Sequence, residues 1–488
     1  MNWKIIFIQE VDRLAISGVI KSIRDIMRKD RGINGDAQRI EQLVWMIFLK
    51  VFDDKEKEWG LEEGYISIIP EKFRWRSWAA NNEGITGEEL LKFIEEMFKK
   101  LKEISATPDG NPKGFIVKSL FEDSINYMKN GVLIRQVINK LNQIDFNKSE
   151  DRHLFNDIYE GILKELQSAG DYGEFYTPRP VTRFIVDMVG PKTKELLLDP
   201  ACGTGGFLTS SIDYLKKNVK NIDEHKLIEK NVLGSELKPL PHLLCTTNLI
   251  LHDIEVPNVE HKDSLGKPLV GYGPSDMVNV IVTNPPFGGA IEPGVELNFP
   301  SLYRTKETAY LFVVLIMKLL RDEGRCGIVL PDGGLMTGDG VAIRIKDKLL
   351  SGFNLHTIIK LPNGVFSPYT DINTNLLFFK KGEPTKDIWY FEHPLPEGYK
   401  KYTKTKPIRY SEFGLEKEWW NNREDVKFSQ YCWKVSMDEI KNKNYNLDSK
   451  NPHVIEEEKQ LSKEEIISKI EKNMNKTQEL LKLIQEAS

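Results

Sequence analysis

The first 150 residues carry a helical pattern of apolar positions. Between residues 40 and 51, apolar side chains recur at steps of three and four, which is the spacing of one helix face: Ile40, Leu43, Val44, Ile47, Phe48 and Val51. Similar stripes run through residues 90–98 and 132–141. Strand-like runs are few in this part of the chain. The pattern predicts an all-helical N-terminal domain over residues 1–150.

From about residue 151, apolar runs typical of strands alternate with helical patterns. The predicted strands are 195–199, 231–235, 278–283, 324–330 and 357–361, and the clearest helical patterns between them are 205–220, 239–252 and 308–322. This alternation is typical of a mostly parallel, doubly wound sheet with helices on both faces. A turn-rich stretch joins the last strand to the apolar run 374–380, which indicates antiparallel pairing at one edge. We expect this second domain to span 151–395.

The regular alternation ends after residue 395. Prolines and lysines gather there, at Pro394, Pro396, Lys400, Lys401, Lys404 and Lys406, and they predict a connector over 396–455. In the tail, 456–488, six positions follow the spacing of a coiled-coil seam: Ile467, Ile470, Met474, Thr477, Leu481 and Ile484. A helix this short barely forms alone in water, so it needs a partner, either the body of the protein or another chain.

Composition bounds the class of protein. A chain of 488 residues with 40% hydrophobic and 29% charged residues is expected to form two or three globular domains. Its four cysteines are far apart and lack the spacing of metal ligands, so we predict no metal site and a reducing compartment. The N-terminus shows no secretory signal, and the longest apolar run, 309–317, is too short to span a bilayer. We expect a cytoplasmic protein without membrane association.

The first candidate site is a glycine turn between a predicted strand and a predicted helix. The apolar run 196–198 leads into Asp199-Pro-Ala-Cys-Gly-Thr-Gly-Gly-Phe207, and a helical pattern follows. Such a turn opens many nucleotide-binding units and is a weak indication alone. Its glycines, Gly203, Gly205 and Gly206, lack the spaced third glycine of the dinucleotide motif. A carboxylate at Asp199 would repel a pyrophosphate and attract a cation.

Two further acids narrow the choice of cofactor. Glu236 ends the next predicted strand, where a carboxylate can accept hydrogen bonds from both hydroxyls of a ribose. Asp263 follows another short segment and could meet an adenine amine. Each acid alone would be a surface residue, whereas three at successive strand ends indicate a cofactor site. S-adenosylmethionine carries an ammonium, a sulfonium, a ribose and an adenine, and it is the predicted cofactor.

The second candidate site is Asn284-Pro285-Pro286-Phe287, directly after the strand 278–283. An Asn carboxamide oxygen and a backbone carbonyl can each accept one N–H of a planar amine, and Phe287 offers a stacking face. Prolines stiffen the backbone and remove competing N–H donors. The alternative is a rigid turn without chemistry. Beside a cationic-cofactor site, the pattern predicts binding of an adenine base whose N6 accepts a methyl group.

The glycine- and proline-containing stretch 288–307 follows this turn. It predicts either a mobile loop that closes over a base flipped out of DNA or an ordinary surface loop. The net charge of −4 gives no basic excess, although proteins that hold DNA alone usually have one. If DNA is the substrate, another subunit is expected to supply much of the binding.

The chain resembles the modification subunit of type I restriction–modification systems, an N6-adenine DNA methyltransferase family. The matching segments are 173–179, 199–207, 234–236 with 248–252, 263–265, 284–287 and 445–452. The resemblance implies a fold with a helical N-terminal domain, a Rossmann-like methyltransferase domain with a mixed sheet, and a helical C-terminal tail. It places the segment Glu174, Phe175, Tyr176, Thr177, Pro178 and Arg179 in the cofactor pocket, together with Thr204, Gly205, Gly206 and Glu236.

The resemblance also implies partners. Two such subunits would join one specificity subunit, with a restriction subunit in the full complex, and the tail would dock on helices of the specificity subunit or fold on its own domain. Two other functions stay open at this stage. One is methylation of a protein glutamine, whose amide could use a similar Asn-Pro-Pro clamp. The other is a scaffold that keeps the fold without turnover.

Overall fold

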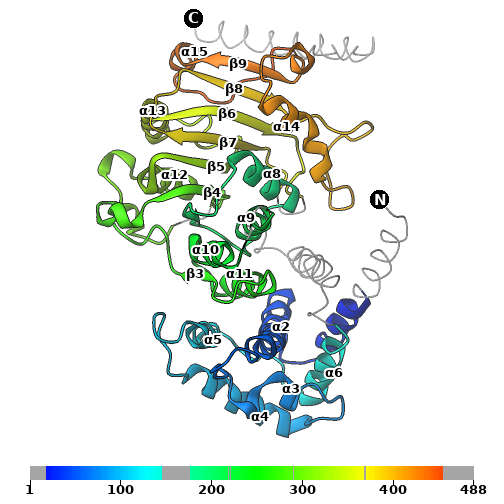
Figure 1. Ribbon diagram of the computed structural model, residues 1–488. Coiled ribbons are helices and arrows are strands. Elements are labelled where there is room, and N and C mark those ends of the chain that lie inside the picture. The colour runs from blue at the N-terminus through cyan, green and yellow to red at the C-terminus, as the bar shows by residue number, and fades with distance from the viewer. Residues whose placement is uncertain are drawn as a thin grey trace, which may run out of the picture.

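The structure is a computed structural model that describes residues 18–144, 176–217, 219, 221–288, 291–367 and 370–453. Two of the predicted cofactor residues, Glu174 and Phe175, lie outside these ranges, as does the tail 456–488. Figure 1 shows two parts stacked along the molecule: a helical N-terminal part, drawn blue to cyan, and a large sheet.

The described N-terminal part is helical, which confirms the predicted all-helical domain. Its elements are α2 (Asp36–Trp59), η1 (Glu71–Phe73), α3 (Trp75–Trp78), α4 (Gly87–Lys102), α5 (Pro112–Glu122) and α6 (Gly131–Leu141). The apolar stripe of α2 is buried, with Val44 and Phe48 fully enclosed. Asparagine side chains cap two of the helices, Asn111 at α5 and Asn130 at α6, and satisfy N–H groups that the helix leaves unpaired.

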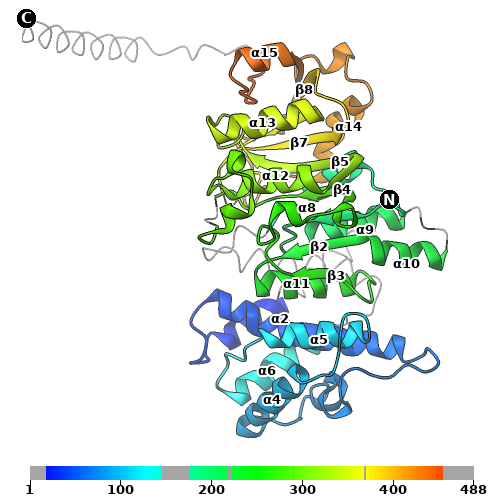
Figure 2. The same ribbon diagram turned by 90° about the vertical axis from the view of Figure 1, so that its left-hand side faces the viewer.

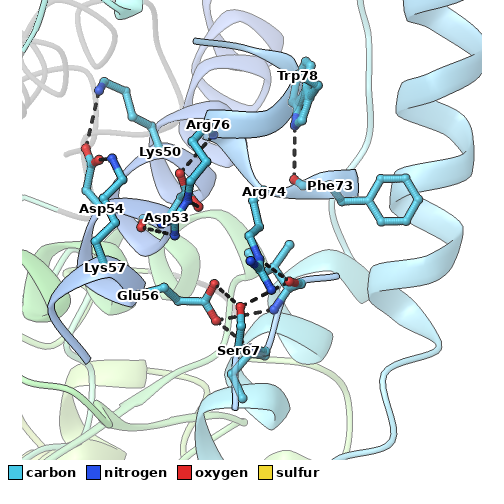
Figure 3. A network of polar contacts seen from close by, with 12 residues as sticks. Lys50, Asp53, Asp54, Glu56, Lys57, Ser67, Phe73, Arg74, Arg76 and Trp78 are labelled. Atoms are coloured by element: carbon cyan, nitrogen blue, oxygen red, sulfur yellow. Dashed lines mark hydrogen bonds and ion pairs between the residues drawn. The ribbon is translucent and has the colours of Figure 1, made fainter. Parts of the chain in front are cut away.

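A polar network at the end of α2 holds the following loop in place (Figure 3). The buried carboxylate of Glu56 accepts hydrogen bonds from Ser67 Oγ at 2.7 Å and from the N–H of Ile68 at 2.6 Å. The Arg76 Nε donates to the buried Asp53 Oδ1 at 2.8 Å. Buried carboxylates are tolerated only when they are paired in this way, so the network fixes the loop against α2.

The second part is one nine-stranded sheet in the order β3-β2-β1-β4-β5-β7-β6-β8-β9. The strands are β1 (Leu197–Asp199), β2 (Val232–Glu236), β3 (Asn258–His261), β4 (Val278–Thr283), β5 (Leu320–Pro331), β6 (Phe353–Leu361), β7 (Thr374–Lys381), β8 (Asp387–Glu392) and β9 (Cys432–Ser436). The five predicted strands and the run 374–380 all appear. The pairings among β3, β2, β1, β4 and β5 are parallel, as the alternation of strands and helices predicts.

Helices cover both faces of the sheet (Figure 2). One face packs against α12 (Thr308–Leu319) and α13 (Val341–Gly352), and the other against α8 (Arg179–Val189), α9 (Gly206–Lys216) and α14 (Gly414–Trp420). The apolar run 309–317 lies in α12, where it is buried against the sheet. No helix in the described ranges combines the length and apolarity needed to cross a membrane.

The antiparallel pairing is confirmed, and it lies deeper in the sheet than the edge. β7 runs antiparallel between β5 and β6, and β8 and β9 extend the sheet beyond β6. The expected connector, 396–455, therefore belongs to the folded domain over its described part: it contains α14, β9 and α15 (Met437–Asn442). The residues Cys432, Trp433 and Val435 of β9 are buried, and this five-residue strand is too short to stand out in a lysine-rich stretch.

One helix joins the two parts. α11 (Pro239–Leu251) lies between the sheet and α2 in both views, and α10 (Ile222–Asn231) precedes β2 (Figures 1 and 2). Its residues Leu244, Ile250 and Leu251 belong to the hydrophobic core of the N-terminal part. Ion pairs reinforce this contact, from Lys55 to Asp253 at 2.8 Å among others. The domain boundary near residue 150 stays a prediction.

Candidate functional site

The predicted site residues gather at the carboxyl ends of β1, β2, β3 and β4. Because these strands are parallel neighbours, the segments that follow them meet at one edge of the sheet. They enclose a cavity of about 200 Å³. Eight predicted residues line it: Thr177, Asp199, Gly203, Gly206, Glu236, Asp263, Asn284 and Pro286. Residues from both candidate stretches thus share one cavity.

The glycine turn has the backbone that its residues predict. Gly203 and Gly205 have φ angles of 53° and 82°, in the left-handed region that residues with a Cβ rarely adopt. A Cβ at Gly205 would also lie 2.8 Å from the Sγ of Cys245 on α11. The N–H of Gly203 donates to Glu236 Oε2 at 3.0 Å, which ties the turn to the end of β2.

The two acids of β1 and β2 are buried at the cavity. Asp199 Oδ1 accepts hydrogen bonds from the Ala201 N–H at 3.1 Å and from Thr283 Oγ1 at 2.7 Å. Burial, with a smaller contribution from the nearby Glu236 charge, raises the pKa of Asp199 to about 7. Burial also raises the pKa of Glu236, against backbone hydrogen bonds that lower it. A cationic ligand would stabilise both carboxylates.

Asn284 presents an unused acceptor. Its Nδ2 donates to Thr177 Oγ1 at 3.0 Å, whereas its Oδ1 is buried and has no hydrogen-bond partner among the described residues. A buried acceptor left unpaired costs about 1–3 kcal/mol. In a cavity lined by Asn284, this is the atom that a ligand N–H would satisfy.

The other predicted residues that the structure describes, Phe287 among them, are not part of the cavity lining. Arg179, the first residue of α8, donates to the Gly206 carbonyl at 2.9 Å, and Asn248 Nδ2 donates to the Thr204 carbonyl at 3.1 Å. Tyr176 and Pro285 are buried, and Pro178 precedes α8. Phe287 is half-buried with its ring edge-on to that of Phe366, the centroids 6.0 Å apart. Its predicted stacking on a base stays a prediction.

Several residues of this site had no role predicted from the sequence. Thr283 supplies the hydroxyl that binds Asp199. Asn248, which belongs to one of the segments that match the family, supplies the donor that holds the glycine turn. The cavity is also lined by Lys238, Lys262, Ile291 and Phe312. Thr283 stands directly before Asn284, but its role depends on β4 lying beside β1, which no local pattern reveals.

The stretch after Asn284–Phe287 is anchored where it is described. Residues 289 and 290 lie outside the described ranges. Further on, Phe299 is buried and Asn298 Nδ2 donates to the Leu265 carbonyl at 2.9 Å, which ties this stretch to the loop that carries Asp263. Whether it closes over a base stays a prediction.

The sheet is mixed, with a glycine turn after β1, acids at the end of β2 and after β3, and an Asn-Pro-Pro turn after β4. This combination defines a class of protein: methyltransferases that act on an amino group. The comparisons with known proteins agree. Residues 150–461 match the N-6 DNA Methylase family, and residues 16–141 match the HsdM N-terminal domain.

Individual relatives narrow the class. The chain is 55% identical to the methylase subunit of the Escherichia coli type I restriction enzyme EcoEI, over 90% of this chain and 91% of that protein. A crystal structure assigned to a type I modification subunit of Vibrio vulnificus YJ016 is 43% identical, with a TM-score of 0.81, and covers 90% of this chain and 97% of that one. A chain from a structural account of type I complex assembly and conformational transition is 35% identical, with a TM-score of 0.79, over 98% of each.

The chain belongs to the N-6 DNA Methylase family, within the methylase subunits of type I restriction enzymes. It is an adenine-specific DNA methyltransferase, and the predicted resemblance and activity are confirmed.

Proposed function

We propose that this chain uses the cavity at β1, β2, β3 and β4 to transfer a methyl group from S-adenosylmethionine to N6 of an adenine flipped out of DNA. The observation that carries the assignment of residues is the unpaired, buried Oδ1 of Asn284 in the same cavity as the buried acids Asp199 and Glu236. The amide of Asn284 offers an acceptor to a ligand N–H, and the two acids offer carboxylates to a cationic ligand.

The residues present fit this cofactor. Asp199 would face the cationic part, Glu236 the ribose hydroxyls and Asp263 the adenine amine, and Thr177 lines the cavity beside them. Glu236 already accepts bonds from the N–H groups of Gly203 and Lys238, and a carboxylate has lone pairs left for two hydroxyls. When bound, S-adenosylmethionine supplies an electrophilic methyl group on a sulfonium.

The chain's own contribution is to hold and orient the amine. Asn284 Oδ1 accepts one N–H of the adenine N6, and a backbone carbonyl of the Pro285-Pro286 turn accepts the other. Two acceptors draw the nitrogen toward tetrahedral geometry, so its lone pair becomes available. No strong base is needed, since the N–H turns acidic as the new bond forms. Alignment of two bound reactants can supply about 7–11 kcal/mol of the barrier.

Thr177 is a positioning residue in this scheme, because its hydroxyl holds the Asn284 Nδ2 and so directs Oδ1 into the cavity. Thr177→Val keeps the shape and removes the hydrogen bond. We expect kcat to fall about tenfold, the equivalent of one hydrogen bond, with a smaller change in KM for the cofactor. Thr177→Ser should restore most of kcat. A serine variant as slow as the valine variant would refute this role.

Partners complete the proposal. The chain would act as the modification subunit of a type I complex, two copies with one specificity subunit that selects the DNA site, and with a restriction subunit in the full assembly. Support comes from the match, over 98% of both lengths, to a chain from the structural account of type I complex assembly. A net charge of −4, which leaves DNA binding to be shared, also supports it.

The test is to incubate the purified chain with labelled cofactor and DNA, with and without its specificity subunit. Label on adenine N6 that requires the partner is the expected result. Label on protein would favour a glutamine methyltransferase, and no label under any condition would favour a scaffold. Either result would refute the proposed function.

The tail, 456–488, lies outside the described residues, and its heptad spacing supports docking on the specificity subunit. Truncation after residue 460 should weaken co-purification with the specificity subunit and leave cofactor affinity unchanged. Equal co-purification of the truncated and full chains would show that the tail serves another purpose.

A further inference from the structure

A lysine-rich segment of the expected connector forms a hairpin with an unbalanced charge. Residues 399–409, here called the basic hairpin, contain five basic residues and no acid: Lys400, Lys401, Lys404, Lys406 and Arg409. Backbone hydrogen bonds of 3.1 Å in both directions between Thr403 and Lys406 close its tip. All five basic residues are exposed. The chain as a whole is acidic, so this local excess differs from its surroundings.

A buried side chain, Tyr402, holds the basic hairpin in place on the domain. The side chain of Tyr402 is fully buried, and its hydroxyl donates to Glu412 Oε2 at 2.9 Å and lies 3.1 Å from His393 Nε2. His393 in turn pairs with Glu416, and both of these side chains are completely enclosed. Burying polar and charged groups is costly unless they bond one another, as His393 does here with Tyr402 and with Glu416. Here it fixes the lysine-bearing backbone without using the lysines themselves.

The basic hairpin lies at the same edge of the sheet as the cavity. It follows β8, which is parallel to β6, and both β5 and β6 run antiparallel to β7, so all of these carboxyl ends share the edge of β4. The N–H of Tyr402 donates to the Asn363 carbonyl at 3.1 Å, in the loop that follows β6. The same loop carries Phe366, whose ring meets that of Phe287. Two contacts therefore connect the basic hairpin to the proposed adenine site.

The lysines have few charged partners in the described chain, and Lys406 Nζ lies 4.9 Å from the centroid of the Tyr399 ring. Lys401 reaches Asp371 at 3.3 Å, and both side chains are about half exposed or more, so water and salt screen that pair. No described carboxylate lies within ion-pair distance of Lys400, Lys404 or Lys406. Exposed ammonium groups on a pre-positioned backbone match the phosphate oxygens of a nucleic-acid strand.

We propose that the basic hairpin binds the phosphodiester backbone of the DNA beside the flipped adenine. This inference rests on the proposed function, since the DNA must enter the cavity from this edge. Phosphate contacts carry no sequence information, so the basic hairpin adds affinity and orientation, while base choice stays with another subunit. When an adenine leaves the base stack, the DNA backbone on either side of it must be held in place. A hairpin that is already fixed does this without the entropy cost of ordering a loop on binding.

The test compares the complex of chain and specificity subunit with a variant carrying Lys400→Gln, Lys404→Gln and Lys406→Gln. Binding to a plasmid fragment that the wild-type complex methylates is measured across a salt series. For each phosphate that the variant no longer neutralises, the slope of log affinity against log salt should fall by about 0.9, and affinity at 0.1 M salt should fall about eightfold. The KM for DNA should rise, with kcat at saturating DNA unchanged.

A matched control removes three exposed lysines near the opposite edge of the sheet, where the strands begin. Its substitutions are Lys194→Gln, which precedes β1, and Lys226→Gln and Lys230→Gln, which lie on α10. This variant should keep the wild-type slope. An unchanged slope in the hairpin variant, or an equal change in both variants, would overturn the inference. Loss of complex assembly with normal cofactor binding would also overturn it, because the basic hairpin would then be a contact for the specificity subunit. The wild-type methylation assay separates these outcomes from failure of the proposed function.

Discussion

Asn284→Ala should lower kcat for DNA methylation about 10²- to 10³-fold, as removal of a single polar group that contacts the reacting atoms does in other enzymes. The physical reason is the buried, unpaired Oδ1 of Asn284, which is the acceptor for the amine. The affinity for cofactor should stay within about twofold, since the acids that face it come from β1 and β2. Steady-state methylation and calorimetric titration of the cofactor measure the two quantities.

Asn284→Asp is the matched control for this variant. It keeps an acceptor at the same place, and the Thr177 hydroxyl can donate to the carboxylate, which replaces the hydrogen bond that the amide donated. We expect it to methylate faster than the alanine variant and more slowly than the wild type. Parallel losses of methylation and cofactor binding in the alanine variant would contradict the separation of roles between the two stretches.

Asp199→Asn should weaken cofactor binding about 10- to 100-fold at pH 8, the usual effect of losing a hydrogen bond to a charged group. In the chain without cofactor, burial raises the pKa of Asp199 to about 7, so this carboxyl still carries its proton below pH 7. A cationic ligand favours the carboxylate and releases that proton. Wild-type affinity should therefore rise up to about tenfold per pH unit toward pH 7 and then level off. The asparagine variant should lack the part of this rise that Asp199 supplies, and Glu236 should supply what remains.

The same substitution should stabilise the cofactor-free chain. The folded-state pKa of Asp199 is raised above the ordinary value of 3.8, so the folded chain binds more protons than the unfolded chain between these two values. Stability therefore falls as the pH rises from about 4 to about 7, and the loss is complete above pH 7. The asparagine side chain can accept the same two hydrogen bonds without a charge. We expect its Tm to exceed the wild-type Tm at pH 8 and to match it near pH 4, by calorimetry. A lower Tm at pH 8 would mean that Asp199 is a structural acid.

Most strands of the sheet and the main residues of the candidate site could be predicted from short stretches of sequence. Apolar runs located β1, β2, β4, β5, β6 and β7 because burial leaves its mark on each strand separately. Gly203 and Gly205 predicted a turn since their backbone angles are strained for other residues. Asp199, Glu236 and Asn284 could be assigned to one site because the carboxyl ends of parallel strands converge.

Other features depended on contacts between distant segments. β9 escaped prediction because a five-residue strand in a lysine-rich stretch gives no clear pattern, and it is defined by its pairing with β8. The position of β7 inside the sheet is likewise defined only by its pairing with β5 and β6. The composition of the basic hairpin predicted a connector. Its attachment to the domain depends on the buried contact between Tyr402 and His393, which no local pattern indicates.

The sequence by itself determined the helical N-terminal domain, the mostly parallel sheet, and the residues proposed to contact cofactor and base, because each depends on local spacing or on the chemistry of single side chains. Only the tertiary structure decided the protonation of Asp199, the free acceptor of Asn284 and the position of the basic hairpin beside the site. The first two follow from burial and from neighbours more than 80 residues away, Thr283 for Asp199 and Thr177 for Asn284. The third follows from the bond between Tyr402 and Asn363. Local patterns report whether a residue is buried, and the folded chain alone reports what lies next to it.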